Sequence, residues 1–184
     1  MRWRVPLGEG YAGPAVAGSR VVVFHRVADG ERVEALDLAS GKRLWKADFA
    51  TNYRGGIDPD HGPRCVPVIA GDAVVAYGAA GDLHCVALQD GSVRGSRAVL
   101  AELQGDEGYF GAGSTPLVVN DLVLVNVGGR NGAGLAAFAL ATGKTVWQTG
   151  DEDASYAAPT LATRGQRSIA VFVTRYHCVA VEPS

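Results

Sequence analysis

The sequence predicts an all-β protein, a β-propeller of four-stranded antiparallel blades with four blades in the chain. Three observations lead to this prediction: a glycine excess among short apolar runs, a unit of about 45 residues that recurs four times, and one segment that repeats without gaps. The chain has 184 residues, of which 25 are glycine and 47% are hydrophobic. This composition is typical of one soluble domain whose short strands are joined by tight turns.

Each repeat opens with a proline that follows small residues. The four prolines are Pro14, Pro67, Pro116 and Pro159. After each proline come a short apolar stretch, a turn and an apolar run, the runs lying at 20–27, 73–77, 122–127 and 169–174. A second turn leads to a third run, at 33–38, 83–88, 135–140 and 176–181. Apolar runs separated by closely spaced turn signals predict antiparallel strands.

The most specific feature is a segment that ends in tryptophan. Residues 35–45 (ALDLASGKRLW) align without gaps with residues 137–147 (AFALATGKTVW). The same frame fits 85–91, with Gly95 where the tryptophan would stand, and it fits 178–184 as far as the chain extends. Glycine after Ser or Thr predicts a tight turn, because glycine enters positive φ without steric penalty. The tryptophan then lies on a fourth strand.

Repetition of one four-stranded unit favours the radial stacking of a propeller over a β-sandwich, which the strand pattern alone would also suit. We predict a single domain over residues 1–184. Its blades are expected at about 13–49, 65–100, 114–149 and 157–181, with an N-terminal strand at 2–6 completing the last blade.

The pattern A-x-D-x-x-T-G-x-x-x-W resembles the tryptophan-docking motif of PQQ-like propellers, the repeat of quinoprotein dehydrogenases. The chain looks closest to the non-enzymatic, outer-membrane assembly lipoprotein-like members, which implies a bacterial periplasm or cell envelope. In that family the tryptophan packs between blades and bonds to backbone. The resemblance therefore implies a structural docking role for six residues: Trp3, Asp37, Gly41, Trp45, Gly143 and Trp147. Only Asp37 keeps the acidic position of the motif, since alanine replaces it in the other repeats.

Trp3 lies in what looks like an orphan fourth strand. The fourth repeat ends just before its own fourth strand, and joining Ser184 to Met1 would bring Trp3 within one residue of the expected tryptophan position. Three closures follow: a four-bladed monomer, an eight-bladed ring of two chains that exchange strands, or part of a longer ring. Because the family usually builds eight blades, we favour the two-chain ring.

Three long loops connect the outer strand of one blade with the inner strand of the next, at 49–64, 101–114 and 149–157. On a propeller such loops gather on one face, and loops on a rigid scaffold commonly carry function. The candidates for a binding face are Tyr53, Arg54, His61, Arg64, Tyr109, Phe110 and Tyr156. Aromatic and arginine side chains suit a protein or peptide partner, and they equally suit solvated loops.

The expected function is a non-catalytic scaffold, and no catalytic residue is predicted. The alternative is a PQQ- and calcium-dependent dehydrogenase-like domain or a fragment of one. Its alcohol-oxidising members use a vicinal disulfide, and no Cys-Cys pair occurs here. No metal site is predicted either: residues 58–61 include Asp58 and His61, but Pro59 restricts the backbone and no further ligands cluster nearby. We expect no cofactor.

Charge and hydropathy exclude further classes of function. The net charge is −2 and no basic run stands out, which argues against nucleic-acid binding. No apolar stretch reaches the roughly 20 residues that span a bilayer, and Met1 to Pro6 holds no apolar signal-peptide segment. The three cysteines, Cys65, Cys85 and Cys178, match no redox or zinc spacing, and the sequence leaves their redox state open.

Overall fold

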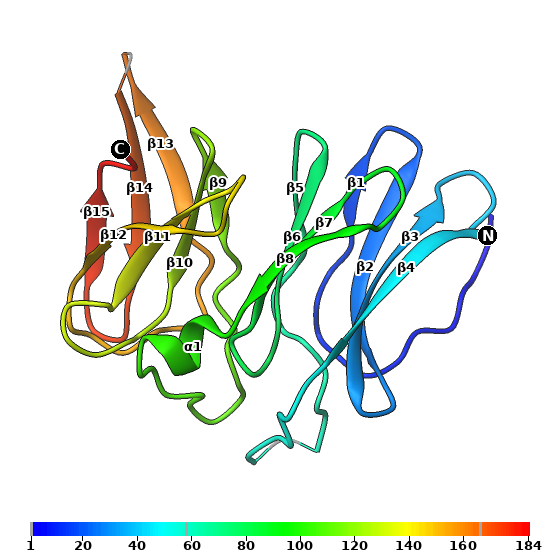
Figure 1. Cartoon of the computed structure of the whole chain (residues 1–184), viewed down its shortest axis with the longest axis horizontal. Helices are drawn as coiled ribbons and strands as arrows, with labels where there is room; N and C mark the ends of the chain where they lie inside the picture. The colour runs from blue at the N-terminus through cyan, green and yellow to red at the C-terminus, as the bar shows by residue number, and fades with distance from the viewer. Residues whose placement is uncertain (1, 58, 166) are drawn as a thin grey trace.

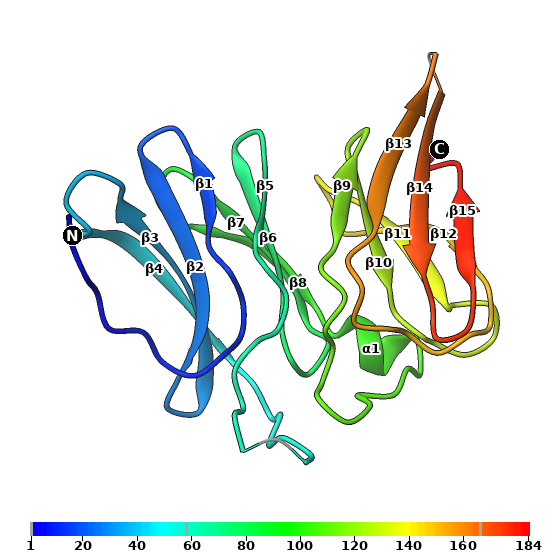
Figure 2. The same ribbon diagram turned by 180° about the vertical axis from the view of Figure 1, so that it is seen from behind.

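A computed structural model of the chain describes residues 2–57, 59–165 and 167–184. Four antiparallel sheets stand side by side like the blades of a fan, with the two termini on opposite sides of it (Figures 1 and 2). The predicted all-β propeller fold is confirmed. One short helix, α1 (Val99–Glu102), follows the second sheet. No helix in the described part of the chain has the length and apolar content needed to cross a bilayer.

Strand order follows chain order within every sheet. The first blade consists of β1 (Ala15–Ala17), β2 (Arg20–Val27), β3 (Gly30–Asp37) and β4 (Arg43–Ala50), and the second of β5 (Val68–Ala70), β6 (Ala73–Tyr77), β7 (Leu83–Ala87) and β8 (Val93–Arg97). The third consists of β9 (Leu117–Val119), β10 (Leu122–Asn126), β11 (Leu135–Ala139) and β12 (Thr145–Thr149). The fourth holds β13 (Thr160–Arg164), β14 (Arg167–Val173) and β15 (Cys178–Val181). The first strands of consecutive blades lie close together, β1 against β5 and β5 against β9.

The inner blades are buried on both faces. In β6, Val74 joins an apolar cluster with Phe24 of the first blade, whereas Val75 joins a cluster with Phe138 of the third. Successive side chains of a strand point to opposite faces, so an apolar neighbour on each side buries the entire strand. For this reason β6 reads as an unbroken apolar run and not as an alternating one.

The turn before the outer strand has the same geometry in three blades. Gly41, Gly91 and Gly143 adopt φ values of +71°, +74° and +68°, a region that glycine enters freely. Each of these glycines donates its N–H to the carbonyl four residues earlier, at 2.7, 2.9 and 2.7 Å. In the first blade, the Asp37 carboxylate also accepts hydrogen bonds from the hydroxyl and the N–H of Ser40, which lower the pKa of Asp37.

Indole rings lie on turns of the neighbouring sheet. Their Nε1–H groups donate to carbonyl oxygens, from Trp3 to Leu38 at 2.8 Å, from Trp45 to Leu88 at 2.9 Å and from Trp147 to Pro183 at 2.9 Å. Two of these turns need glycine for a second reason, close approach. A Cβ on Gly91 would lie 2.5 Å from the ring of Trp45, and one on Gly41 would lie 2.8 Å from the ring of Trp3. Glycine thus lets the rings seat against the backbone.

The N-terminal segment differs from the expectation. Residues 2–6, expected to complete the fourth blade, are not part of that sheet, and the fourth sheet contains three strands in the described residues. Instead, Trp3 and Val5 pack on Val21, Val23 and Leu36, on the face of the first blade that points away from the second. The reason is local: Trp3 finds the turn at Gly41 in its own chain, whereas the fourth blade lies across the fan (Figure 1).

Replacing Trp45 with alanine should lower the free energy of unfolding by about 3–5 kcal/mol. The indole is 8% exposed, and its loss would leave a void beside Gly91 and an unpaired Leu88 carbonyl. Urea denaturation followed by circular dichroism measures the difference. The neighbouring Leu44→Ala is the control, because Leu44 is 48% exposed and its truncation should change stability by about 0.5 kcal/mol or less. A Trp45→Ala protein as stable as this control would contradict the prediction.

Candidate functional site

The three long loops meet at one end of the fan, at the bottom of Figure 1. A Cβ on Gly56, in the first loop, would lie 2.7 Å from the carbonyl oxygen of Tyr109 in the second. The second loop joins the third through the N–H of Phe110, which donates to the hydroxyl of Tyr156 at 3.1 Å. We call this end of the molecule, formed by residues 49–64, 101–114 and 149–157, the loop face.

Three of the aromatic candidates come together on the loop face. Tyr109 is 65% exposed, Tyr156 is 47% exposed and Phe110 is 39% exposed. The rings of Phe110 and Tyr156 meet edge to face, with their centroids 5.7 Å apart. Tyr156 also lies directly over Gly113, where a Cβ would come within 2.2 Å of its ring. Packing therefore holds Tyr156 in place while about half of its surface remains exposed.

A hollow of about 600 Å³ opens beside these aromatic rings. Its wall includes Tyr109 and Tyr156 together with Arg130, Asp153 and Arg175. The Asp153 carboxylate bridges the two arginines, at 3.1 Å from Arg130 and 2.9 Å from Arg175. Sequence reasoning missed these three residues as a group because Arg130 and Arg175 lie in turns inside blades and not in the long loops.

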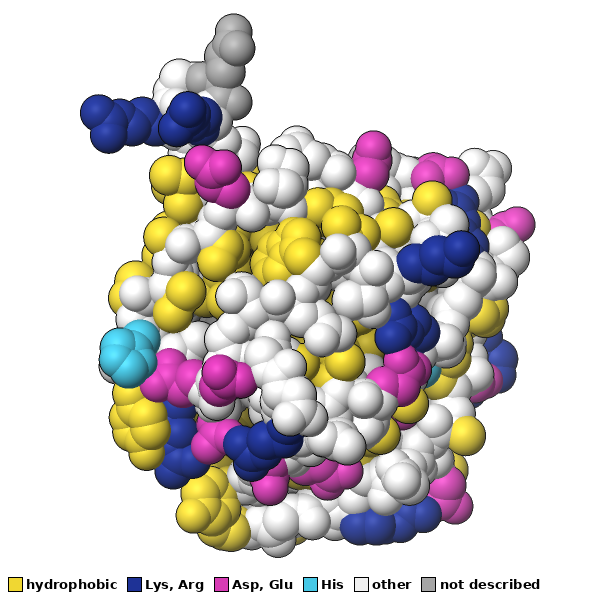
Figure 3. Space-filling model, turned by 60° about the vertical axis from the view of Figure 1, so that its left-hand side comes forward, with side chains coloured by type: hydrophobic (Ala, Val, Ile, Leu, Met, Phe, Trp, Pro, Cys, Tyr) yellow, Lys and Arg dark blue, Asp and Glu magenta, His cyan; other side chains and the backbone are white. Residues whose placement is uncertain are grey.

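On the side of the molecule seen in Figure 3, charges of both signs are interspersed near this end. Figure 3 shows acidic and basic side chains alternating with hydrophobic ones in its lower half, and no area of one sign dominates there.

Two predicted candidates lie in the interior and not on the surface. Tyr53 is 2% exposed and the side chain of Arg64 is 8% exposed. Arg64 places its guanidinium 5.8 Å from the centre of the Tyr53 ring and donates to the carbonyl of Asp60 at 2.8 Å. The buried Arg26 donates to the carbonyl oxygens of Tyr53 and His61, at 2.9 and 3.2 Å. These residues support the first loop from inside, so, contrary to the expectation from the sequence, the Tyr53 and Arg64 side chains are not exposed on the loop face.

The remaining two candidates stand apart from the aromatic cluster. Arg54 is exposed, with its guanidinium 3.9 Å from the carboxylate of Asp29. His61 is half-buried, and its backbone N–H donates to the Glu9 carboxylate at 3.1 Å. The structure therefore does not gather all seven predicted residues into one patch.

The segment weighed as a metal site serves a structural purpose. Asp58 lies outside the described residues. The carboxylate of Asp60 accepts backbone hydrogen bonds from Gly10 at 3.0 Å and from Gly62 at 2.8 Å, and it pairs with Arg64 at 3.2 Å. Among the residues that the structure describes, no three His, Cys, Asp or Glu side chains are grouped so that they could hold a metal ion.

A buried carboxyl group lies at the first interface between blades. Glu31, at the start of β3, is 1% exposed and accepts the N–H of Ala79 of the second blade at 2.8 Å. Within the described residues, its other oxygen finds no hydrogen-bond donor. Burial raises the pKa of Glu31 to about 7, and the nearby Asp82 adds to the rise. The Glu31 carboxyl group therefore takes up its proton at a higher pH than an exposed glutamate does.

The fold defines the class of protein as a β-propeller of repeated four-stranded blades. Residues 29–183, most of the chain, match the sequence profile of the PQQ-type family described as outer membrane protein assembly factor BamB. The chain belongs to this family. A search of curated proteins finds no match.

Solved structures share the fold. BamB from Moraxella catarrhalis is 24% identical with a TM-score of 0.59, and the match covers 95% of this chain and 48% of BamB. Quinohemoprotein alcohol dehydrogenase from Comamonas testosteroni is 18% identical with a TM-score of 0.63, covering 92% and 33%. The computationally designed Ika4 protein is 14% identical with a TM-score of 0.61, covering 97% and 96%. This chain thus spans about half of the BamB chain that it matches.

Replacing Glu31 with glutamine should flatten the pH dependence of stability. Because the pKa is about 7 in the folded protein against an ordinary value of 4.5, the folded state holds a proton that the unfolded chain releases. Stability therefore falls as pH rises from about 4.5 to 7, by at most roughly 3 kcal/mol for this group. Urea denaturation at several pH values should show a smaller fall in stability for Glu31→Gln than for the wild type. Parallel profiles for wild type and Glu31→Gln would refute the assignment.

Proposed function

We propose that this chain is a non-catalytic scaffold that binds a protein or peptide partner through the loop face. The observation that carries the proposal is the aromatic cluster of Tyr109, Phe110 and Tyr156, which is exposed yet held by packing beside a hollow with two arginines. Tyrosine and arginine dominate the binding energy of protein interfaces. Side chains that are already held in place lose little entropy when a partner binds.

Family membership supports the same proposal. The family carries the description outer membrane protein assembly factor BamB, a description that suggests contact with other proteins. From this description we take two proposals for the present chain: that it binds proteins, and that it is located in the periplasm or cell envelope. The solvated-loop alternative accounts for the charged residues of the loop face but not for three clustered, exposed rings.

A PQQ- and calcium-dependent dehydrogenase-like domain, or a fragment of one, is the alternative function. Structural likeness to quinohemoprotein alcohol dehydrogenase and to a europium-containing methanol dehydrogenase motivates it. The sequence identities are 18% to the alcohol dehydrogenase and 22% to the methanol dehydrogenase, so the similarity supports a shared fold but not a shared activity.

A photo-crosslinking amino acid at position 109 should capture a partner polypeptide in a lysate of the source organism, whereas the same residue at position 93 should not. Both wild-type side chains are exposed, Tyr109 at 65% and Val93 at 57%, but Val93 lies on the outer strand β8, away from the loop face. With the partner identified, Tyr109→Arg should weaken binding of the purified partner about 30-fold, as expected for a central aromatic residue, without changing the melting temperature.

Two outcomes would overturn the scaffold proposal. One is equal crosslinking from positions 93 and 109, or unchanged partner binding by Tyr109→Arg. The other is clear thermal stabilisation by PQQ with calcium, since a ligand at a hundredfold its dissociation constant adds about 2.7 kcal/mol to stability. That second result would favour the dehydrogenase-like alternative.

We also propose that two copies of the chain associate into an eight-bladed ring. Strand β15 pairs with β14, and no described strand covers its other edge. The face of β14 that points away from Phe172 carries Ile169, Val171 and Val173, of which Val173 is 48% exposed. Across the fan, Trp3 and Val5 of the same chain already sit on the first blade.

In this arrangement, residues 2–6 of one copy complete the fourth blade of the other copy as its outer strand. Trp3 keeps its contact with Gly41 of its own chain while its backbone pairs with β15 of the partner. Trp3 then joins two blades across the seam, in the same way as Trp45 joins the first blade to the second. Exposed apolar faces and open strand edges both favour such association.

Sedimentation equilibrium should give twice the chain mass of 19.1 kDa for the wild type. Val171→Glu places a charge on the uncovered face of β14 and should weaken association at least tenfold, which requires only about 1.4 kcal/mol. Val93→Glu, on the exposed outer strand of an inner blade, should leave the mass unchanged. A strictly monomeric wild type would exclude the two-chain ring and would leave the loop-face proposal standing.

A further inference from the structure

The interface between the second and third blades lacks an indole. Gly95 of β8 occupies the register position that Trp45 has in β4 and Trp147 has in β12. A Cβ on Gly95 would meet no atom within 4 Å. The space left beside it is a cavity of about 100 Å³ between the two blades.

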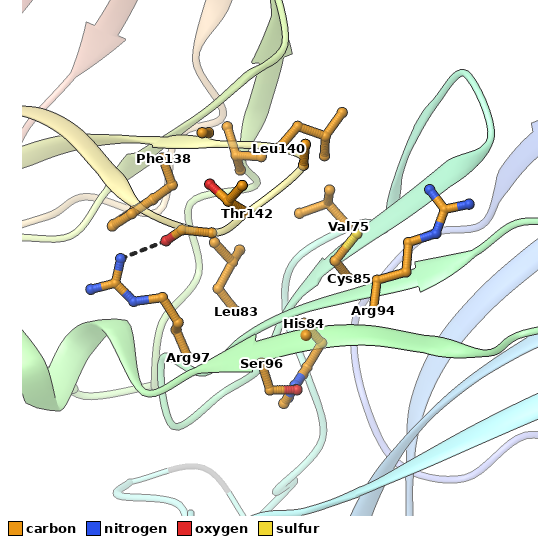
Figure 4. A pocket seen from close by; sticks show the side chains of 15 residues that line it. Val75, Leu83, His84, Cys85, Arg94, Ser96, Arg97, Phe138, Leu140 and Thr142 are labelled. Atoms are coloured by element: carbon orange, nitrogen blue, oxygen red, sulfur yellow. Dashed lines mark hydrogen bonds between the residues drawn. The ribbon is translucent and has the colours of Figure 1, made fainter.

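The walls of this cavity are mostly apolar. Figure 4 shows Leu83, Val75 and Cys85 on the side of the second blade and Phe138, Leu140 and Thr142 on the side of the third. The His84 and Ser96 side chains are hydrogen-bonded to each other at 2.8 Å, and the His84 ring stacks on Phe49 of the first blade, on the opposite face of the sheet. The cavity is therefore an apolar slot whose rim includes the exposed Arg94 and Thr142.

Arg97 fills part of the space that an indole would take. Its guanidinium donates to the carbonyl of Gly143 at 2.7 Å and to the hydroxyl of Thr145 at 3.0 Å, and it lies 4.9 Å from the centre of the Phe138 ring (Figure 4). Its Cδ would be 3.6 Å from a Cβ on Gly143. An arginine side chain thus spans one side of the gap, and its guanidinium, which is also paired with the Glu102 carboxylate, lies next to the remaining cavity.

The third blade also has a carbonyl oxygen equivalent to those that accept the indole hydrogen bonds at the other interfaces. Trp3 and Trp45 donate to the carbonyl oxygens of Leu38 and Leu88. Leu140 occupies the equivalent position in the third blade, three residues before Gly143, just as Leu38 and Leu88 stand three residues before Gly41 and Gly91. A ring N–H seated here would meet the carbonyl of Leu140 in the same way.

We propose that this cavity is a binding site for a small planar aromatic molecule with a ring N–H, such as indole. The aromatic ring would lie in the slot where the repeat elsewhere places a tryptophan side chain, with its N–H donating to Leu140 and its face beside Arg97. Apolar cavities of about 150 Å³ bind benzene, and this slightly smaller one opens at its rim, so that one edge of a bicyclic ring can remain in solvent. The site involves none of the three long loops and does not depend on the proposed function.

Protection of the Cys85 thiol provides the test. In a Cys178→Ser background, Cys85 is the partly exposed cysteine and Cys65 is fully buried, so iodoacetamide reports on Cys85. Indole at about 2 mM should slow this modification about threefold, which corresponds to a dissociation constant of about 1 mM. The analogue 1-methylindole, which lacks the N–H, should bind about fivefold more weakly because one hydrogen bond is lost.

Gly95→Trp supplies the ring from within the chain and tests the same geometry without a ligand. This variant should melt several degrees above wild type and should lose the response to indole, whereas Val93→Trp, at an exposed position of the same strand that is paired with Val86 and not with Cys85, should change neither. The proposal is overturned if indole leaves the modification rate of Cys85 unchanged up to its solubility limit, or if 1-methylindole protects as strongly as indole. Retention of the indole response by a folded Gly95→Trp protein would also overturn it, since binding would then lie elsewhere.

Discussion

The contact between an indole on one blade and a glycine turn on the next is the interaction on which the rest of this structure depends. An isolated sheet with two apolar faces cannot remain in water, so every inner blade needs a neighbour on each side. Apolar side chains supply the driving force but little direction, because they can pack at several offsets. The hydrogen bond from the ring of Trp45 to Leu88, over a glycine that admits close approach, selects one offset. When the blades are fixed at this offset, the loops that connect them lie together at one end of the molecule.

Where the indole is missing, the interface is held by other contacts. Arg97 bonds to the turn at Gly143, and Val99 and Leu100 of α1 join the apolar cluster between the second and third blades. A void of about 100 Å³ would destabilise the fold by about 2 kcal/mol if it stayed empty. Retaining such a void is tolerable because the same interface buries Tyr77 and Phe138 completely. A tolerated void is also a space that a ligand can enter without displacing any side chain.

Local repetition made the blades predictable, whereas contacts distant in sequence decided the rest. The strands, the glycine turns and the candidate docking positions follow from a unit that recurs with the same spacing. The burial of Tyr53 does not follow from the repeat. The Tyr53 backbone is held by Arg26, which lies 27 residues earlier on another strand and cannot be recognised as its partner from the loop sequence. The position of residues 2–6 depends likewise on whether Trp3 finds a turn in its own chain. The ion pairs of Asp153 with Arg130 and Arg175 likewise require the third and fourth blades to pack side by side, which the loop sequence does not reveal.

If the loop face binds a partner and the chain forms the proposed two-chain ring, the geometry of the fan links the two properties. A twofold ring would repeat the loop face, because both subunits of a closed dimer use the same surfaces. Two hollows, each with Tyr109 and Arg175 in its wall, would then open toward the same end of one rigid body. A partner with two contact segments would bind such a rim far more tightly than it binds a single copy, since the second contact is intramolecular. Binding of such a partner and formation of the ring are thermodynamically linked: the free energy by which the ring strengthens partner binding equals the free energy by which the partner stabilises the ring. A substitution at Val171 that weakens the ring must therefore also weaken the bivalent complex.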